Sequence, residues 1–209
     1  MALRAGFVGL GHIGGVMAGR LLEAGLETTV FDVRPEAAAP LAGKGAKTAG
    51  SARQLAAASD VVGVCVRDDA DVRAVLGGPE GLLAGARPGL VVAVHSTILP
   101  PTVRALGEEA AAHEVALLDA CVTGGPAGAA QGALVVMAGG EADALETARP
   151  YLDAFSRQVV HVGPLGSGAA VKLCNNLMTY LGFLSAFEAT LLAREAELST
   201  EAFEAVTRA

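Results

Sequence analysis

The feature that most constrains this chain is a repeated alternation of short apolar runs with longer, Ala-rich segments. The apolar runs predict strands at residues 5–10, 28–32, 61–66, 90–95, 115–119, 134–138 and 159–162, with a shorter one at 44–48. The segments between them predict helices at 12–24, 51–58, 71–76, 102–112 and 141–155. Apolar runs that are separated by helices are typical of a parallel sheet covered on both faces. We therefore predict an α/β fold with a doubly wound, mostly parallel sheet.

A long helix follows the last predicted strand. The run 163–168 is rich in helix breakers, and Ser167 within it is a candidate N-cap. From residue 169 to about 198 only Gly182 disfavours a helix, which predicts a single helix of roughly 30 residues. We expect residues 1–163 to form one domain and residues 164–209 to begin an incomplete all-α domain. Because such an apolar helix needs covering, we expect a homo-oligomer that associates through it.

Composition excludes several classes of partner. The formal charge is −7, and nucleic-acid binding requires a basic surface, so nucleic acid is not expected. No uncharged run reaches the ~18 residues that a membrane span requires. The 3 cysteines are widely spaced and the first residues lack the pattern of a signal peptide. We therefore expect a cytoplasmic protein without a membrane partner or a metal site.

A glycine pattern lies between the first predicted strand and the first predicted helix. It has the form G-x-G-x-x-G and consists of Gly9, Leu10, Gly11, His12, Ile13 and Gly14. In this context Gly9 permits a tight turn, Gly11 admits a pyrophosphate close to the backbone, and Gly14 allows close packing of helix and strand. The alternative is a tight turn without a ligand. The strand–turn–helix context favours a Rossmann-type dinucleotide site.

An acidic residue at the end of the second predicted strand extends this prediction. Asp32 lies at about the expected distance from the glycine pattern, and its carboxylate would accept both hydroxyls of an adenosine ribose. The same carboxylate would repel a 2′-phosphate, so NAD is favoured over NADP as the cofactor. Val33 and Arg34 are included as cofactor contacts, and Arg34 would stabilise a 2′-phosphate by bending back. NADP therefore stays open as an alternative.

Polar groups also follow two later predicted strands. Thr97 offers a hydroxyl to the nicotinamide side of the cofactor, whereas His95 is interpreted as a buried strand-end histidine. Thr123, Gly124 and Gly125 combine a hydroxyl with two flexible backbone amides, a set suited to the carboxylate of a substrate. Ligands of doubly wound sheets gather at the carboxyl ends of the strands, so these groups are expected to converge. A Ser/Thr turn and an ordinary glycine loop are the respective alternatives.

A lysine lies in the long predicted helix among Leu, Met and Phe residues. Lys172 and Asn176 are four residues apart and therefore share one face of the helix. Desolvation and a nearby nicotinamide cation would both lower the pKa of Lys172 toward that of an acid/base group. The alternative is a lysine whose amine reaches solvent.

Taken together, these segments resemble the β-hydroxyacid dehydrogenases, a family that includes 3-hydroxyisobutyrate dehydrogenase, tartronate semialdehyde reductase and the related 6-phosphogluconate dehydrogenases. The resemblance covers the glycine pattern, the Ser96-Thr97-Ile98 segment, the run from Asp119 to Gly125, and the run from Gly166 to Asn176. It implies that Lys172 is the catalytic acid/base, that Asn176 orients the substrate, and that Thr123 with the following glycine amides holds its carboxylate. It also implies cofactor contacts at Val66 and Arg67.

The chain departs from the family pattern at several positions. Cys121 replaces a loop proline, and Val66-Arg67-Asp68 replaces the usual Leu-Pro-containing cofactor loop. The resemblance nevertheless implies an NAD(P)-dependent oxidoreductase that transfers a hydride between nicotinamide and the hydroxyl-bearing carbon of a small 3-hydroxy acid. Two alternatives stay open, a reductase of another substrate such as an imine or a semialdehyde, and a dinucleotide-binding or dimerising module with little catalysis.

Overall fold

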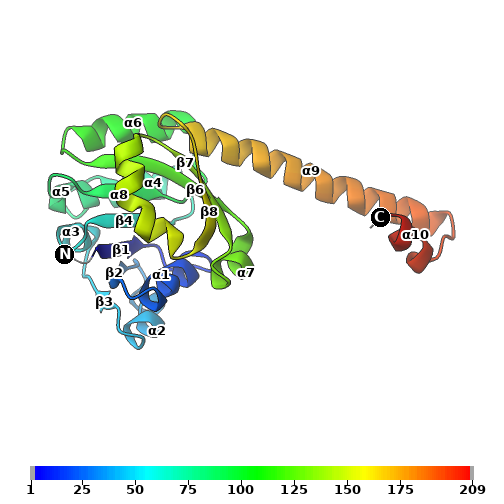
Figure 1. Ribbon diagram of the computed structural model, residues 1–209, viewed down its shortest axis with the longest axis horizontal. Helices are drawn as coiled ribbons and strands as arrows, with labels where there is room; N and C mark the ends of the chain where they lie inside the picture. The colour runs from blue at the N-terminus through cyan, green and yellow to red at the C-terminus, as the bar shows by residue number, and fades with distance from the viewer. Residues whose placement is uncertain (1–2, 208–209) are drawn as a thin grey trace. The chain divides into compact units, whose positions relative to one another are not determined.

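The computed structural model describes residues 3–207 of the chain (Figure 1). The chain divides into two compact units, and the division lies between Lys172 and Leu173. The first unit contains every strand of the described residues.

The first unit is built on an eight-stranded sheet with the order β3-β2-β1-β4-β5-β6-β7-β8. All neighbouring strands are parallel except β6 and β7, which pair in the antiparallel direction. The predicted α/β fold with a doubly wound, mostly parallel sheet is therefore confirmed. The strands are β1 (Arg4–Val8), β2 (Glu27–Phe31), β3 (Lys47–Thr48), β4 (Val61–Val64), β5 (Val91–Val94), β6 (Ala116–Thr123), β7 (Leu134–Gly139) and β8 (Ser156–Gly163).

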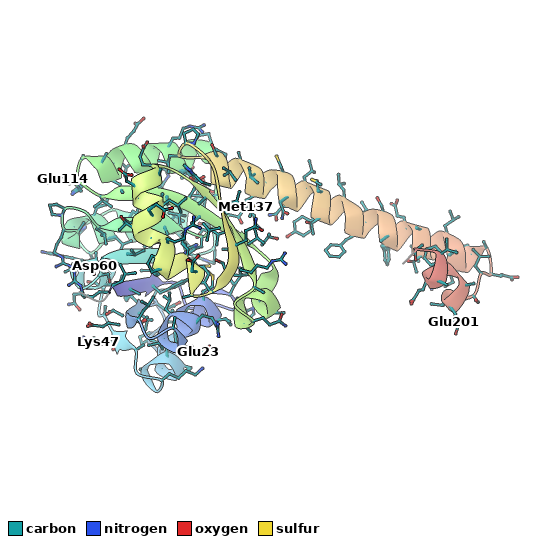
Figure 2. The ribbon with its side chains drawn as sticks, viewed as in Figure 1. Glu23, Lys47, Asp60, Glu114, Met137 and Glu201 are labelled. Carbon is teal, nitrogen blue, oxygen red and sulfur yellow. The ribbon has the colours of Figure 1, made fainter. Side chains whose placement is uncertain are left out.

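Helices cover both faces of this sheet, and each face has its own apolar core. One core contains side chains of α1 (Gly14–Glu23), α2 (Ala39–Ala42), α7 (Gly125–Ala130) and α8 (Ala142–Asp153). The other contains side chains of α3 (Ala52–Ala57), α4 (Asp69–Leu76), α5 (Leu82–Gly85) and α6 (Pro100–Ala111). Valine, leucine and alanine fill most of both cores. Charged side chains such as Glu23, Lys47 and Glu114 are exposed around them (Figure 2).

Local sequence signals explain where several helices begin. The Ser51 hydroxyl accepts a hydrogen bond from the Gln54 amide, as expected for the N-cap of α3. The carboxylate of Asp68 caps α4 in the same way by accepting from the Asp71 amide. The short helices α2, α5 and α7 and the 3-10 turn η1 (Pro35–Ala37) were not expected from the sequence.

The antiparallel pair β6–β7 has a simple chain-length explanation. A parallel pair needs a crossover connection of roughly a dozen residues or more, usually with a helix. The connection from Thr123 to Leu134 contains only the short helix α7, so the chain returns beside β6 in the opposite direction.

The long helix α9 (Ser167–Glu195) begins in the first unit and continues into the second, where α10 (Thr200–Thr207) follows. The prediction of one long helix is thus confirmed, although it begins at Ser167 and not after it. Among residues 3–207, no helix is both long and apolar enough to cross a membrane.

Candidate functional site

The turn between β1 and α1 contains three glycines, and two of them are required by the backbone itself. Gly9 has a φ of +89°, and a Cβ atom on it would lie 2.2 Å from the Cys65 carbonyl oxygen. A Cβ on Gly14 would lie 2.1 Å from the carbonyl oxygen of Gly9. A Cβ on Gly11 would meet no atom within 4 Å. Gly9 and Gly14 are therefore needed for the backbone itself, whereas Gly11 leaves open space above it.

Asp32 follows β2 and holds this turn in place. Its Oδ2 atom accepts a hydrogen bond of 2.7 Å from the Leu10 amide, and its Oδ1 atom accepts one of 2.9 Å from the Arg34 amide. The Arg34 guanidinium lies 3.4 Å from the same carboxylate, whose side chain is only 6% exposed. The acidic group thus connects the end of β2 to the glycine turn.

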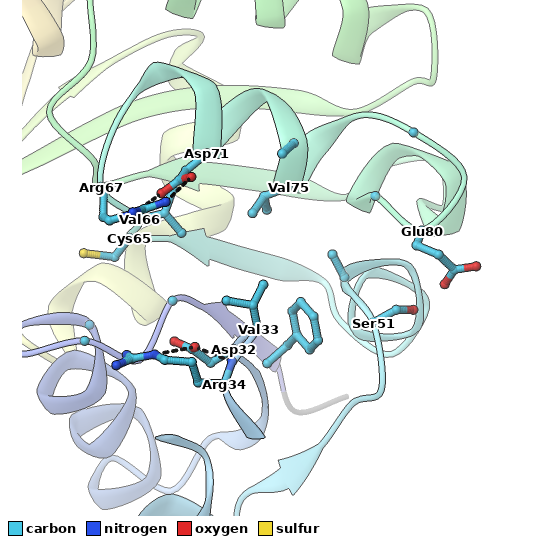
Figure 3. A pocket seen from close by; sticks show the side chains of 18 of the residues that line it. Asp32, Val33, Arg34, Ser51, Cys65, Val66, Arg67, Asp71, Val75 and Glu80 are labelled. Atoms are coloured by element: carbon cyan, nitrogen blue, oxygen red, sulfur yellow. Dashed lines mark hydrogen bonds and ion pairs between the residues drawn. The ribbon is translucent and has the colours of Figure 1, made fainter. Parts of the chain in front are cut away.

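A cavity of about 1100 Å³ opens above the glycine turn (Figure 3). Its walls carry two arginine–carboxylate pairs, Arg34 with Asp32 on one side and Arg67 with Asp71 on the other. The predicted cofactor residues that line it are Gly9, Gly11, His12, Ile13, Gly14, Asp32, Val33, Arg34, Val66 and Arg67. Leu10 and Thr97 are not among the lining residues. Leu10 is buried and bonded to Asp32, whereas Thr97 is exposed after β5.

The cavity also involves residues that the sequence reasoning missed. They are Cys65, Asp71, the start of α3 and the segment from Gly77 to Gly81. The signal that was available is the cluster of glycine and proline after α4, which predicts a loop. This segment lies more than 60 residues after the glycine pattern, so nothing in the sequence indicated that the two line one cavity.

Side chains hold together the ends of β4, β5 and β6. The Ser96 hydroxyl accepts a hydrogen bond of 2.8 Å from the Val66 amide, which belongs to the cavity wall. The Nδ1 atom of His95 donates to the Ala120 carbonyl oxygen at 2.7 Å, and the Cys121 thiol donates to the Ser96 carbonyl oxygen at 3.5 Å. These bonds continue the link between β5 and β6 past Asp119, the last residue of β6 that pairs with β5.

His95 itself is buried in an aromatic cluster. Its ring lies nearly parallel to those of Phe7 and Tyr151, which also lie nearly parallel to each other, and the ring of Phe155 is perpendicular to it. Burial lowers the pKa of His95 to about 4, so the ring is neutral at neutral pH. The Nε2 atom has no hydrogen-bond partner. This arrangement agrees with the interpretation of His95 as a buried strand-end residue.

The predicted carboxylate-binding segment lies at the end of β6. Thr123 is half-buried, and the backbone of Gly124 and Gly125 has φ values of +120° and +64°. Two successive residues with positive φ require glycine in practice, because other residues rarely adopt this conformation. Gly124 is exposed, and Gly125 is half-buried.

Lys172 lies in the first turns of α9 and is half-buried. Burial lowers the pKa of Lys172 below that of a free lysine, because desolvation disfavours the charged amine. Its amine interacts electrostatically with Cys121 on β6, and burial raises the pKa of the Cys121 thiol to about 12. The Cys121 thiol is therefore neutral at neutral pH. Asn176 lies on the same helix in the second unit and is half-buried.

These residues fit a bound dinucleotide. The open space over Gly11, the buried carboxylate of Asp32 and the size of the cavity match the requirements for its pyrophosphate, ribose and length. The fold and this site define the class of the protein, a Rossmann-type domain with a dinucleotide site.

Comparison with known proteins gives the family. Residues 4–163 match the family model described as the NAD binding domain of 6-phosphogluconate dehydrogenase. An NAD-dependent L-serine dehydrogenase of Pseudomonas aeruginosa is 41% identical over 186 residues, which cover 89% of this chain and 62% of that protein. A solved structure of Mycobacterium tuberculosis 3-hydroxyisobutyrate dehydrogenase with L-serine has a TM-score of 0.91 and 34% identity, and the match covers all of this chain and 71% of that one. The chain therefore belongs to the β-hydroxyacid dehydrogenase family of NAD(P)-dependent oxidoreductases.

A more distant likeness concerns the fold alone. An imine reductase of Myxococcus stipitatus in complex with NAD+ has a TM-score of 0.90 at 23% identity, over all of this chain and 72% of that one.

Proposed function

We propose that this chain carries the cofactor site and the acid/base group of a dehydrogenase that acts on small 3-hydroxy acids, with Lys172 as the proton carrier. The observation that carries the proposal is the position of Lys172. Its half-buried amine interacts electrostatically with Cys121, and the Cys121 thiol donates to the Ser96 carbonyl oxygen. The Ser96 hydroxyl accepts from the Val66 amide of the cavity wall, so the strand end that carries Cys121 is bonded to the cofactor cavity.

Each group has a defined part in the proposed reaction. When bound, the nicotinamide ring supplies the hydride acceptor or donor. The amine of Lys172, with its lowered pKa, takes the proton of the substrate hydroxyl during oxidation and returns it during reduction. Thr123 and the amides of Gly124 and Gly125 hold the substrate carboxylate, and Asn176 orients the substrate beside the lysine.

The substrate class follows from the chemistry that the relatives have in common. L-serine and 3-hydroxyisobutyrate, named for two of them, are both carboxylates with a primary alcohol on the carbon next to the carboxylate-bearing one. They differ only in an ammonium or a methyl substituent. We propose that this chain serves the same class. An imine or a semialdehyde is the alternative substrate class. The lysine does not distinguish a hydroxy acid from a semialdehyde, because reduction of a semialdehyde is the same proton and hydride transfer in reverse.

The proposal also includes the cofactor preference and the association of the chain. Asp32 favours NAD over NADP, since its buried carboxylate is suited to ribose hydroxyls and repels a phosphate. The exposed apolar side chains of α9, among them Met178 and Phe183, support self-association through this helix.

The direct test replaces the proposed proton carrier. Lys172→Ala is expected to lower turnover of a 3-hydroxy acid by at least about a hundredfold, as is typical for loss of a general base, while NADH affinity changes little. NADH fluorescence titration and a substrate series with both cofactors measure the two effects separately. Lys44→Ala, the same change at an exposed loop residue, is the matched control.

Two outcomes would contradict this reading. Full turnover by Lys172→Ala would remove the lysine from the mechanism. Tight NADH binding by the unchanged chain, without turnover of any hydroxy acid, would favour the dinucleotide-binding or dimerising module.

A further inference from the structure

Asp119 is a fully buried carboxylate on β6 that bonds a distant part of the chain. Its Oδ1 atom accepts a hydrogen bond of 3.0 Å from the Gly166 amide, and its Oδ2 atom accepts one of 2.7 Å from the Ala169 amide. Ala169 lies in the first turn of α9, and Gly166 directly precedes that helix. The carboxylate therefore connects the middle of the sheet to the first turn of the long helix.

The start of a helix is a favourable place for this carboxylate. The first amides of an α-helix have no partner within the helix, and the N-terminal end carries a partial positive charge. Asp119 supplies acceptors to two such amides and a negative charge to that end. Burial raises the pKa of Asp119, while the donating amides of Ala169 and Gly166 oppose this effect. We call this pair of hydrogen bonds from Asp119 the anchor of α9. Ser167, the N-cap candidate from the sequence, is the first residue of the helix itself.

Two glycines leave the space that this contact needs. A Cβ atom on Gly139 would lie 2.4 Å from Oδ1 of Asp119. A Cβ on Gly168 would lie 2.3 Å from the Asp119 carbonyl oxygen and 2.5 Å from that of Met137. Any side chain at either position would push α9 away from the sheet. The glycine pattern at 166–168 therefore serves a contact between backbone and carboxylate.

The sheet fixes Asp119 on both sides. It pairs with Val94 of β5 in the parallel register and with Gly139 of β7 in the antiparallel register. Asp119 is thus held where the two ladders of β6 overlap. A group anchored there has little freedom to move relative to the strand ends.

Lys172 follows Ala169 by one helical turn and lies in the same first part of α9. We propose that Asp119 is a positioning residue, which fixes the first turn of α9 on the sheet and thereby holds the Lys172 amine at the ends of β5 and β6. This inference rests on the proposed function for the meaning of Lys172, whereas the anchor itself is a property of the chain alone.

The test replaces the carboxylate with its neutral isostere. In Asp119→Asn one oxygen becomes an amide nitrogen, which opposes a backbone donor instead of accepting from it. Hydrogen exchange at the Gly166 and Ala169 amides is expected to become faster by about tenfold or more, as for the loss of a charge-assisted hydrogen bond. Asp153→Asn, the same change at an exposed position on α8, is the matched control and is expected to leave both amides unchanged.

A second measurement follows the lysine itself. Reductive ¹³C-methylation allows the titration of Lys172 to be followed by NMR without any cofactor. In Asp119→Asn the pKa of Lys172 is expected to rise toward that of an exposed amine, and turnover is expected to fall while NADH affinity stays within about twofold. An unchanged Lys172 titration would overturn the positioning role, even if turnover fell.

The unchanged protein provides a test if the variant does not fold. Without Asp119 as acceptor the Ala169 amide has no partner in the helix, so slow exchange at Ala169 in the full chain is expected only if the anchor exists. Rapid exchange there would refute the proposal. If Lys172→Ala retained turnover while the Ala169 amide stayed protected, the proposed function would fail and the anchor would stand.

Discussion

The carboxylate of Asp32 supports the glycine turn before any cofactor binds. It accepts hydrogen bonds from the Leu10 and Arg34 amides, so it stabilises the backbone that surrounds the pyrophosphate position. Its role as reader of the ribose is a separate, proposed function. Since both roles belong to one side chain, removing it has consequences for either cofactor, and only the difference between cofactors reports on the ribose.

Asp32→Ala is expected to weaken NAD binding by about tenfold or more and NADP binding by less, because the variant loses ribose acceptors for NAD but also a repulsion toward the 2′-phosphate. Paired titrations with NADH and NADPH measure the ratio. Arg34→Ala is the companion variant, and it is expected to weaken NADPH binding more than NADH binding. Equal losses for the two cofactors in Asp32→Ala would contradict the assignment of Asp32 as ribose reader.

Strands β5 and β6 are joined by two different kinds of hydrogen bond. Backbone pairing extends from Val91 with Ala116 to Val94 with Asp119. Beyond it, the side chains of His95 and Cys121 donate hydrogen bonds to backbone carbonyls of the other strand's continuation. The His95 ring can donate to Ala120 as a neutral ring. Protonation would place a charge inside an aromatic cluster that offers no partner for Nε2.

The stability of the chain should therefore depend on pH through His95. Its pKa is about 4 in the folded protein against 6.5 for an ordinary histidine, so the unfolded state binds the proton more readily. The contribution of His95 to the free energy of unfolding is fully present above pH 6.5. It is lost as the pH falls toward 4, by a total of about 3 kcal/mol.

Urea unfolding at several pH values measures this slope, and His95→Gln is expected to flatten it over that range. His113→Gln, at an exposed position, is the control and is expected to keep the slope. A His95→Gln variant with the same pH dependence as the unchanged chain would assign the slope to other groups.

Much of the element order could be predicted from local signals. The strands lie within a few residues of the predicted apolar runs because buried parallel strands are uniformly apolar. The glycine turn was also predictable, since its residues are consecutive. The reversal at β7 was not, because the direction of a strand depends on the connection and leaves no mark on its composition.

The contacts that assemble the candidate site were beyond local reasoning for a related reason. Asp119 lies 47 residues before Gly166 and 50 before Ala169. No local pattern in either segment indicates that the two are in contact. The motif from Gly166 to Asn176 was recognisable, whereas the reason for its glycines was not. A side chain at Gly168 would collide with the backbone of Asp119 and Gly139, which lie on two strands that become neighbours only in the folded sheet.

As a whole, the chain combines a well-covered sheet unit with a helix that is apolar on most sides. Residues of α9 such as Met178, Phe183 and Leu192 are 76%, 70% and 72% exposed. A helix that is apolar all round is usually buried in its functional form. The second unit therefore calls for a covering surface, for which a second copy of the chain is our proposal.

Sedimentation over a range of protein concentrations is expected to show association. Association would bury these apolar side chains, and the removal of apolar surface from water is favourable. The double change Phe183→Glu and Phe187→Glu is expected to shift the equilibrium toward the single chain, while NADH binding in the first unit is retained. Leu99→Glu, at an exposed position before α6, is the control and should leave association unaffected. A single-chain species at every concentration would contradict self-association.

Strand β6 continues from Ala120 to Thr123 beyond its last residue paired with β5, and there it pairs only with β7. Ala120, Cys121 and Val122 in this overhang are buried, and the positive φ values of Gly124 and Gly125 require glycine, so substitutions at these five positions are costly. Thr123 is half-buried, and Pro126 and Ala127 are exposed. Directed evolution toward new acids should therefore find its tolerated changes at these three positions, while the glycine turn stays intact. One enzyme scaffold would in this way yield a series of catalysts that share a cofactor and differ in the acid they accept.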